Sequence, residues 1–589
     1  MKFSLLADAY EKIEATAARL EITDILAALF KEASARDIDK IIYLSQGVVA
    51  PPYEGIEVGM GEKFVEEAIS LSSGHSRGRV ESEYKKLGDL GKVAEKLLAE
   101  KKQTSLYREH LTVEKVFNVF YKIAKTGGAG SQAMKIKSLM ELLNSASPKE
   151  ARYIVRFPIG KLRLGIGDPT ILDALSFYKR GDKSLREELE RAYNLCSDLA
   201  LVARTLFEHE DAVKKFKITP FKPIRPALAE RLPSAEEIIE KIGKCAVEAK
   251  YDGFRLQVHK QDKRVEIFSR RLERMTHMFP EIVEGVRKEV RAKEAIFEGE
   301  ALAFNDASGE YYPFQFTIQR KRKHGVEEKA DEFPLHLFAF DVLYADGVDY
   351  TTHTYAQRRE ELRALIGKVG KGDTISIADS IITDDPKKLE KFFEESVERG
   401  LEGIIAKDLN APYVAGARKF AWIKLKRSYK GELEDTIDLV IAGYYLGKGR
   451  RAKFGFGGLL GAVYDEDEDV FKTVTKIGSG FSEEQMSGLK KMLDKIKLQR
   501  KPARLDSILE PDFWVDIKYV ITVAADEITR SPLHTCGRKK GDETGYALRF
   551  PRMVGEIRSD KKPEDATTVN EIIEMFGAQK KLAIGGEGA

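Results

Sequence analysis

The chain has 589 residues, too many for a single hydrophobic core, so several domains are expected. Hydrophobic residues make up 43% and charged residues 33%, which is typical of a globular protein with a heavily charged surface. The formal net charge is only +3, so a surface that binds nucleic acid requires local clustering of basic residues. The three cysteines, Cys196, Cys245 and Cys536, form no CxxC pair, which argues against structural zinc and against a disulfide framework.

No part of the sequence indicates secretion or membrane insertion. Residues 1–20 mix Asp, Glu and Lys with apolar residues, unlike a signal peptide. No uninterrupted apolar run approaches the roughly 20 residues that span a bilayer. We therefore expect a cytoplasmic monomer with no membrane partner.

Residues 1–217 are expected to form an all-α domain. Apolar residues such as Phe3, Tyr10 and Ile13 recur at helical spacing, and helix-stop signals separate such stretches. Three prolines within 220–226 force extended backbone and remove amide donors, which predicts a linker at this point.

Residues 218–427 follow a mixed pattern, which predicts an α+β domain. Apolar and polar residues alternate in Phe254–His259, and a polar turn then leads into Val265–Phe268, as in a β-hairpin. Charged helical stretches such as 386–398 interleave with the apolar segments.

Residues 428–589 are expected to form a β-barrel of the OB type with a C-terminal helical tail. Short strands are predicted at 439–445, 459–464 and 514–524, with glycine-rich turns around them. The predicted fold class is therefore multidomain, with all-α, α+β and β-barrel domains in that order.

Segment Glu248–Arg255 is the strongest candidate for chemistry. It places Lys250 in a loop ahead of a strand, with Gly253 for a tight turn and Arg255 on the strand beyond. An amine attacks phosphorus only when it is deprotonated, so its pKa must be lowered by nearby cations or by burial. Arg255, and further on Arg270, would supply positive charge and bind phosphate oxygens. On this segment alone, a surface hairpin with solvated side chains stays an open alternative.

Further charged residues lie beside or on predicted strands. Glu298 and Glu300 share one strand face, and paired carboxylates suit a hydroxyl group or Mg²⁺. Glu402 precedes another short apolar strand. Lys424 and Lys426 share a strand face, where two cations repel each other unless an anion such as phosphate lies between them. Taken singly, each of these features is also compatible with a solvated surface.

Taken in order, these segments resemble the motif series of the covalent nucleotidyltransferases, the superfamily of DNA ligases, RNA ligases and mRNA capping enzymes. The series runs Lys-x-Asp-Gly-x-Arg, Glu-Gly-Glu, Phe-Asp, Glu-Gly-Ile-Ile-Ala-Lys and Lys-x-Lys. Arg549–Arg552 and Arg558–Lys561 resemble the last motif of the ATP-dependent DNA ligases. Segments 84–91 and 160–167 are similar to the helical DNA-binding domain of archaeal and eukaryotic replicative ligases. Glu298 is a departure, since relatives usually carry Asp there.

The resemblance implies a DNA ligase that seals nicks with 3′-hydroxyl and 5′-phosphate ends in duplex DNA, during replication, repair and recombination. Lys250 would attack the α-phosphorus of ATP, AMP would pass from the lysine to the 5′-phosphate, and the 3′-hydroxyl would displace it. The three domains would be a helical DNA-binding domain, an adenylation domain and an OB-fold domain.

Each candidate site residue receives a role from this resemblance. Asp252 would orient the nucleophile loop, and Arg558 and Lys561 would assist departure of pyrophosphate when the OB-fold domain closes. The implied nucleotide ligands are Glu248 and Phe340 for the adenine, Glu300 for the ribose, and Arg255, Arg270, Arg418, Lys424 and Lys426 for phosphates. Glu402, with Glu300 sharing the role, would bind the catalytic Mg²⁺ or Mn²⁺.

Two further segments concern partners. Gln103–Tyr107 resembles the short motif that binds sliding clamps, and the alternative is a helix connector with Leu106 and Tyr107 packed inward. Loop 160–167 lacks the Gly-Lys-[Ser/Thr] ending of a P-loop. Contacts to the DNA backbone through its amides, Lys161 and Arg163 are expected instead.

Other functions remain as alternatives. An mRNA guanylyltransferase or an RNA ligase would share the lysine motif, but the long helical region and the C-terminal motif disfavour both. A non-catalytic DNA-binding or clamp-binding scaffold would have no need of Lys250, Glu402 and the lysine pair together. An NAD⁺-dependent ligase would carry a nicotinamide-binding domain and a four-cysteine zinc module, and neither is visible. Use of ADP or NAD⁺ beside ATP stays open.

Overall fold

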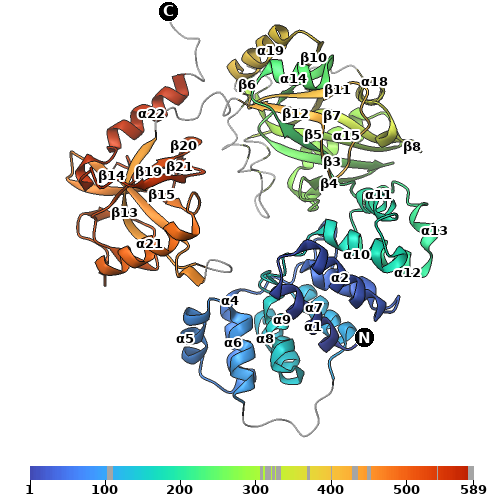
Figure 1. Cartoon of the computed structure of the whole chain (residues 1–589). Coiled ribbons are helices and arrows are strands. Elements are labelled where there is room, and N and C mark those ends of the chain that lie inside the picture. The colour runs from blue at the N-terminus through green and yellow to red at the C-terminus, as the bar shows by residue number, and fades with distance from the viewer. Residues whose placement is uncertain are drawn as a thin grey trace, which may run out of the picture. The chain divides into compact units, whose positions relative to one another are not determined.

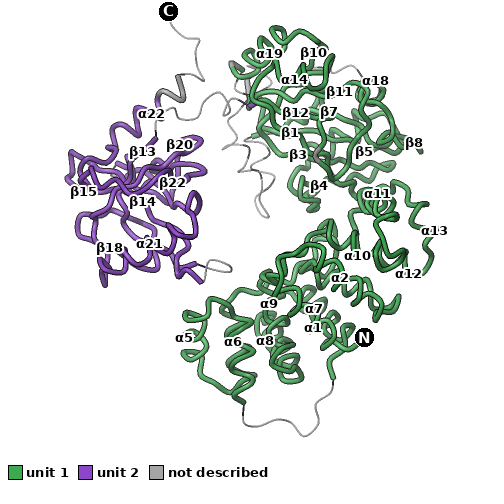
Figure 2. Tube along the Cα trace, viewed as in Figure 1, with its two compact units in different colours: residues 1–425 green, residues 426–589 purple. Residues whose placement is uncertain are grey.

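The computed structural model describes residues 1–101, 110–305, 333–367, 372–399, 401–426, 436–447, 453–539 and 541–581, with isolated positions at 310–311, 317, 320, 326, 330 and 370. The chain forms two compact units, residues 1–425 and 426–589 (Figure 1, Figure 2). Among the described residues, no helix combines the length and the apolar character that crossing a membrane requires.

The first part of unit 1 is helical, as the periodicity of its apolar residues predicts. α9 begins after Ser147, whose side chain forms a capping box with Glu150, and α5 ends at Gly88 in the left-handed conformation. The described helices are α1 (Phe3–Ala15), α2 (Arg19–Lys31), α3 (Ile38–Gln46), η1 (Pro52–Glu54), α4 (Glu62–Ser73), α5 (Arg77–Leu87), α6 (Leu90–Ala99), α7 (Val113–Lys125), α8 (Ser131–Ser145), α9 (Pro148–Arg156), α10 (Asp168–Arg180), α11 (Arg186–Cys196), α12 (Leu199–Glu208) and α13 (Glu210–Val213).

Helices α6 and α9 approach each other closely because Gly91 lies at their contact. A Cβ atom at this position would lie 2.5 Å from the carbonyl oxygen of Arg152 and 2.8 Å from Cγ of Arg156. The short separation lets the buried Arg156 guanidinium reach Asp89, the N-cap of α6, at 2.6 Å. A charge this deeply buried is stable only when it is paired, so the helix contact and the ion pair depend on each other.

The glycine-rich loop 160–167 is tied to this helix contact. Arg163 forms an ion pair with Asp89 at 2.9 Å, and Lys161 forms one with Glu62 at 2.5 Å. The two segments that resemble a DNA-binding domain therefore lie side by side. Both basic residues expected to contact DNA are paired with carboxylates in this structure.

The proline-rich linker is held against strand β3 (Phe254–Gln261). Phe221 donates its backbone N–H to Nδ1 of His259 at 3.0 Å, and Ile224 donates its backbone N–H to Oε1 of Gln257 at 2.8 Å. Burial lowers the pKa of His259 to about 3, so the ring is neutral and free to accept a hydrogen bond. The linker is thus part of the packed structure of unit 1.

The second part of unit 1 contains two sheets. One has the strand order β1-β12-β11-β2-β10, and the other has β4-β3-β5-β7-β8 with β6 on β5 and β9 on β7. The described elements are β1 (Leu228–Arg231), α14 (Ala235–Ile242), β2 (Cys245–Lys250), β3, β4 (Arg264–Ser269), η2 (Thr276–Met278), α15 (Pro280–Glu289), β5 (Glu294–Asn305), β6 (Glu310–Tyr311), β7 (Leu335–Ala345), β8 (Val348–Asp349), η4 (Tyr350–Thr352), α18 (Tyr355–Ile366), β9 (Ile375–Ile377), β10 (Ser380–Thr383), α19 (Pro386–Glu398), β11 (Gly403–Asp408) and β12 (Arg418–Lys426).

Helices cover one face of each of these sheets. α15 and α18 pack on the larger sheet, and α19, with α14 beside it, packs on the smaller one (Figure 1). Contacts between Lys407 on β11 and Phe340 on β7 join the remaining faces. This arrangement turns the predicted site residues of both sheets toward one another.

Unit 2 is built on a curled sheet with helices at its surface. The path β16-β18-β13-β14-β15-β17 is extended by β19 and β22, and β20 pairs with β21. Its described elements are β13 (Ile437–Tyr445), β14 (Gly458–Asp465), β15 (Val470–Ile477), α21 (Glu483–Leu493), η6 (Asp494–Ile496), β16 (Lys497–Leu498), β17 (Leu505–Asp506), β18 (Phe513–Val515), β19 (Val520–Ala524), β20 (Glu527–Ser531), β21 (Gly545–Arg549), β22 (Arg552–Ile557), η7 (Pro563–Asp565) and α22 (Val569–Lys581).

The prediction of a single strand over 514–524 is wrong. Two strands, β18 and β19, occupy this stretch, and both pair with β13. β18 pairs at Gly443 and Tyr444, whereas β19 pairs at 437–440, so the chain must leave the sheet between them to shift along β13. Such pairing with a distant strand has no local signature in the sequence.

The Gly91 contact yields a stability test. Gly91→Ala places a methyl group against the backbone of α9, so we expect the free energy of unfolding to fall by about 1–3 kcal/mol. Thermal unfolding followed by calorimetry measures this. Gly78→Ala in α5 is the matched control, because a Cβ there meets nothing within 4 Å and alanine favours helix. Equal effects of the two substitutions would contradict the close-contact explanation.

Candidate active site

Lys250 is the last residue of strand β2, which corrects the prediction that it lies in a loop. β2 pairs with β11, where Gly403 lies opposite Lys250, and with β10. These distant partners extend the strand further than the local sequence indicates. The Lys250 ammonium group forms an ion pair with Glu402, and both side chains are largely but not fully buried, with 20% and 27% exposed.

The turn after Lys250 is shaped by a close backbone approach. A Cβ on Gly253 would lie 2.3 Å from the carbonyl oxygen of Ala301 on β5, so this position excludes any larger residue. Tyr251 is buried and stacks on Phe338 of β7 at 4.4 Å between ring centroids. Asp252 is exposed between these two fixed residues. The nucleophile candidate therefore stands at the edge of a rigid turn.

Glu300 lies on β5 directly opposite Arg255 on β3. Burial raises the pKa of Glu300 to about 7, Lys250 and Arg255 lower it, and Glu402 and Asp252 raise it further. Glu300 is thus near enough to four charged groups, all predicted site residues, for them to act on its pKa. Because the pKa of Glu300 stays raised, Lys250 and Arg255 compensate its negative charge only in part.

Arg255 is engaged by the protein rather than by solvent. Its Nη2 pairs with the buried Glu298 at 2.8 Å, and its Nη1 donates to the carbonyl oxygen of Ala227 at 2.7 Å. Glu298 also accepts the hydroxyl of Tyr413 at 2.8 Å. The Nε atom of Arg255 is buried and has no hydrogen-bond partner among the described residues, so one donor of this side chain is unsatisfied.

Phe340 offers an aromatic face in the same region. It lies on β7 and contacts Trp422 of β12 edge-on at 6.0 Å between ring centroids, with the Arg255 guanidinium 5.5 Å from its ring. A half-exposed ring between two cations, Arg255 and Lys407, is suited to stacking on a planar base.

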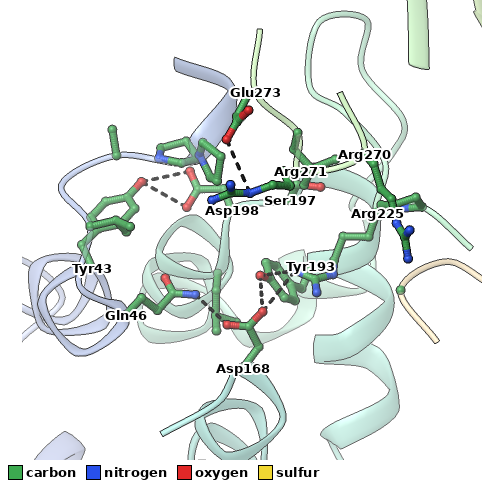
Figure 3. Close-up of a pocket in the computed structure, with 18 of the residues that line it drawn as sticks. Tyr43, Gln46, Asp168, Tyr193, Ser197, Asp198, Arg225, Arg270, Arg271 and Glu273 are labelled. Atoms are coloured by element: carbon green, nitrogen blue, oxygen red, sulfur yellow. Dashed lines mark hydrogen bonds and ion pairs between the residues drawn. The ribbon is translucent and has the colours of Figure 1, made fainter. Parts of the chain in front are cut away.

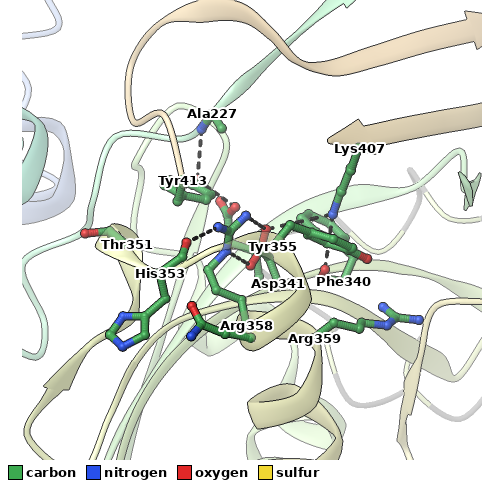
Figure 4. Close-up of polar contacts among 12 residues, drawn as sticks. Ala227, Phe340, Asp341, Thr351, His353, Tyr355, Arg358, Arg359, Lys407 and Tyr413 are labelled. Atoms are coloured by element: carbon green, nitrogen blue, oxygen red, sulfur yellow. Dashed lines mark hydrogen bonds and ion pairs between the residues drawn. The ribbon is translucent and has the colours of Figure 1, made fainter. Parts of the chain in front are cut away.

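Glu248 is buried in a network of charged and polar groups. Figure 4 shows other members of this network, among them Asp341, Arg358 and Lys407. Its carboxylate forms an ion pair with Lys407 at 2.7 Å and accepts hydrogen bonds from the Tyr355 hydroxyl and, at 3.2 Å, from Arg359. Burial lowers the pKa of Lys407, while Glu248 and Asp341 oppose that shift. The carboxylate predicted to bind adenine is thus bound by protein groups here.

The same network extends behind Phe340. Arg358 is fully buried and binds Asp341 through two hydrogen bonds, at 2.7 and 3.1 Å. Lys407 donates to the carbonyl oxygen of Phe340 at 3.1 Å. Tyr355, Arg358, Arg359, Lys407 and Tyr413 were not among the predicted site residues. The available sequence signal was the pair of adjacent arginines in helix α18, where one face should be apolar.

The remaining predicted phosphate ligands are more dispersed. Lys424 lies on β12 beside Arg231 of β1, and Lys426 ends the same strand. Arg418 begins β12, but its side chain is outside the described residues. Arg270 is exposed and lines a cavity of about 540 Å³ with Tyr43, Asp168, Asp198 and other residues of the helical region (Figure 3). The structure therefore joins Arg270 to the helical region rather than to the Lys250 cluster.

Arg558 and Lys561 lie in unit 2. Both contact one carboxylate oxygen of Asp438, at 3.4 Å and 2.7 Å. Segment Gln103–Tyr107 falls outside the described residues. His534 and Cys536 are buried, which leaves them in the core of unit 2.

Comparisons with known proteins agree along the whole chain. The family models "DNA ligase N terminus", "ATP dependent DNA ligase domain" and "ATP dependent DNA ligase C terminal region" match residues 2–176, 226–426 and 452–561. The chain is 52% identical to a "Probable DNA ligase" of Dictyoglomus turgidum, with 99% of this chain and 98% of that protein covered. It is 43% identical to a "DNA ligase" of Nitrosopumilus maritimus, with 99% of each covered.

A solved structure, "Pmar-Lig_PreS3", shares the fold with a TM-score of 0.57 at 17% identity, covering 93% of this chain and 98% of that one. The identities to the two relatives extend over nearly the full length of each protein, so the likeness is not confined to one domain. The chain therefore belongs to the ATP-dependent DNA ligase family, and its activity is the sealing of nicks in DNA.

Proposed function

We propose that Lys250 is the nucleophile of this ligase and forms a lysyl-AMP intermediate. The observation that carries the proposal is the ion pair between Lys250 and Glu402. It lies beside the buried Glu300, whose charge is influenced by Lys250, Arg255, Glu402 and Asp252. The amine would attack the α-phosphorus of ATP, forming a nitrogen–phosphorus bond as pyrophosphate leaves. Glu402 contacts the ammonium group and is the neighbour placed to accept its proton before attack.

The same cluster supports the proposed nucleotide site. Phe340 would stack on the adenine, and the unpaired Nε of Arg255 would donate to the bound nucleotide. Glu248 would contact the adenine, and its ion pairs with Lys407 and Arg359 would set the orientation of its carboxylate. Lys424, Lys426 and Arg418 would bind phosphates of the nucleotide. Arg270, which lies beside the helical region, would bind phosphates of the DNA. AMP would then pass to the 5′-phosphate of the nick, where the 3′-hydroxyl would displace it.

A divalent cation fits Glu300 and Glu402. Their oxygens are hard ligands of the kind that such ions prefer. Burial disfavours the ionised form of Glu300 and raises its pKa, and a bound cation would stabilise that form. Among the described residues, no group of three or more His, Cys, Asp or Glu side chains forms a metal site, which suits Mg²⁺, since this ion commonly uses one or two carboxylates with phosphate oxygens. When bound, the metal would neutralise phosphate charge during transfer.

We further propose the domain division 1–217, 218–427 and 428–589, as DNA-binding, adenylation and OB-fold domains. Segments 84–91 and 160–167, which meet through Arg163 and Asp89, would contact the backbone of a nicked duplex. A monomeric cytoplasmic enzyme stays a prediction, and use of ADP or NAD⁺ beside ATP stays an open alternative.

Lys250→Ala should abolish transfer of label from α-labelled ATP to the protein, because no amine remains to form the bond. Labelling is read on a denaturing gel, with GTP, ADP and NAD⁺ tested in parallel. Lys244→Ala is the control, since this exposed lysine just precedes the same strand and should leave labelling unchanged. Persistent labelling of Lys250→Ala would contradict the assignment of Lys250 as the nucleophile.

Chelation of divalent ions should stop labelling of the protein by ATP. Either Glu300→Gln or Glu402→Gln should raise the Mg²⁺ concentration needed for half-maximal labelling by at least about tenfold. Removing one carboxylate lowers the negative charge that holds the cation. Glu294→Gln, at the start of the same strand β5, is the control. If all three variants need equal Mg²⁺, these carboxylates are not the metal ligands.

Leu106→Ala/Tyr107→Ala should reduce retention of the chain on an immobilised sliding clamp, because the two apolar side chains are the expected anchors. The measurement is a pull-down with wild type and variant at equal concentration. Equal retention would favour the alternative, in which this segment only connects helices.

A further inference from the structure

Asp438 holds both basic residues of the C-terminal motif. It lies on β13 in unit 2, with only 12% of its side chain exposed, opposite Thr522 on β19. Its Oδ2 atom contacts Nζ of Lys561 at 2.7 Å and Nη1 of Arg558 at 3.4 Å. Two cations that would otherwise repel each other therefore share a single carboxylate oxygen.

Asp438 is itself held in place by one hydrogen bond to its carboxylate and two to its backbone. Its other oxygen, Oδ1, accepts the Thr522 hydroxyl at 2.7 Å. The backbone N–H of Asp438 donates to Oγ1 of Thr567 at 3.0 Å, and the backbone N–H of Thr567 donates to the carbonyl oxygen of Asp438 at 2.9 Å. These bonds leave Oδ2 directed at the two cations.

Arg558 is fixed at its backbone as well. Arg558 donates its backbone N–H to the carbonyl oxygen of Val520 at 2.8 Å. Its Nε and Nη2 bind Asp560 at 2.8 and 2.6 Å, but Asp560 is 63% exposed and its hold on the guanidinium is weakened by solvent. The semi-buried Asp438 is the anchor common to Arg558 and Lys561.

We propose that Asp438 is a positioning residue for enzyme adenylation. It aligns Arg558 and Lys561 so that both cations bind the departing pyrophosphate. This inference rests on the role that the family resemblance implies for Arg558 and Lys561, which is to assist departure of pyrophosphate. A pyrophosphate group carries several oxygens and accepts from both cations at once, as Oδ2 of Asp438 does in their present arrangement. Asp438 thereby sets the spacing of the two donors before the nucleotide arrives.

The test uses the full-length enzyme with Asp438→Asn. Asparagine keeps the size of the side chain and an oxygen for Thr522, but it loses the charge that holds the cations. We expect single-turnover adenylation by ATP to slow by about 10- to 100-fold in rate constant, with a smaller change in the half-saturating ATP concentration. Sealing of a nick that already carries AMP on its 5′-phosphate should stay within about twofold of wild type, because no pyrophosphate leaves in that step.

A second readout needs no nucleotide. Hydrogen–deuterium exchange of peptides covering 558–561 should accelerate in Asp438→Asn, since the segment loses its anchor. Asp494→Asn is the matched control, because Asp494 also joins two lysines and a hydroxyl, those of Lys490, Lys497 and Tyr444, elsewhere in unit 2. It should change neither exchange at 558–561 nor adenylation. Asp438→Glu should restore part of the adenylation rate.

The variants separate failure of this inference from failure of the proposed function. If Arg558→Ala and Lys561→Ala leave adenylation unchanged, the proposed role of the pair is wrong, and the inference falls with it. If they slow adenylation but Asp438→Asn does not, or accelerates it, the inference alone is overturned. If Asp438→Asn/Arg558→Ala is no slower than Arg558→Ala, the two residues act together as proposed.

Discussion

The ion pair between Glu248 and Lys407 is the constraint on which the two-sheet region depends. Both side chains are almost fully buried, at 3% and 1% exposure, and each buried charge costs several kcal/mol unless it is paired. The two residues lie on β2 and β11 of the smaller sheet. Their other partners, Tyr355, Arg359 and the Phe340 carbonyl, come from α18 and β7 on the side of the larger sheet. Neither sheet can slide over the other without leaving a charge uncompensated.

This constraint also positions Lys250, the proposed nucleophile. Side chains two residues apart on a strand point to the same face, so anchoring Glu248 sets the direction of Lys250. Glu248 is buried between the sheets. Lys250 is partly exposed to solvent and contacts Glu402. The close approach of Gly253 to Ala301 then limits the turn that follows. An amine held in this way has lost most of its freedom before substrate binds, which is how positioning accelerates displacement at phosphorus.

The sequence predicted the helical region, the mixed region and the residues of the Lys250 cluster, because these have local periodicity or occur in an ordered series. It did not predict the partners of Glu248. Tyr355 and Arg359 lie more than a hundred residues away in α18, and their helical spacing indicates only a helix. The extension of β2 through Lys250 was missed for a similar reason, since it depends on pairing with β10 and β11. Side-chain networks and strand ends depend on distant neighbours, so local patterns carry no signal for them.

A common arrangement recurs among the cations proposed to bind phosphate. Arg255 lies on Glu298, Arg163 on Asp89, and Arg558 with Lys561 on Asp438. A cation that is paired with a carboxylate is already oriented before the phosphate binds. When the phosphate binds, the cation exchanges its carboxylate partner for a phosphate partner. The free-energy change of that exchange is small compared with capture of phosphate by an unpaired cation. A ligase must release pyrophosphate, AMP and the sealed duplex in every cycle, so moderate binding serves it better than tight binding. The chain carries 98 Lys and Arg residues against 95 Asp and Glu, so a near-neutral net charge is compatible with phosphate-binding cations that are each paired with a carboxylate.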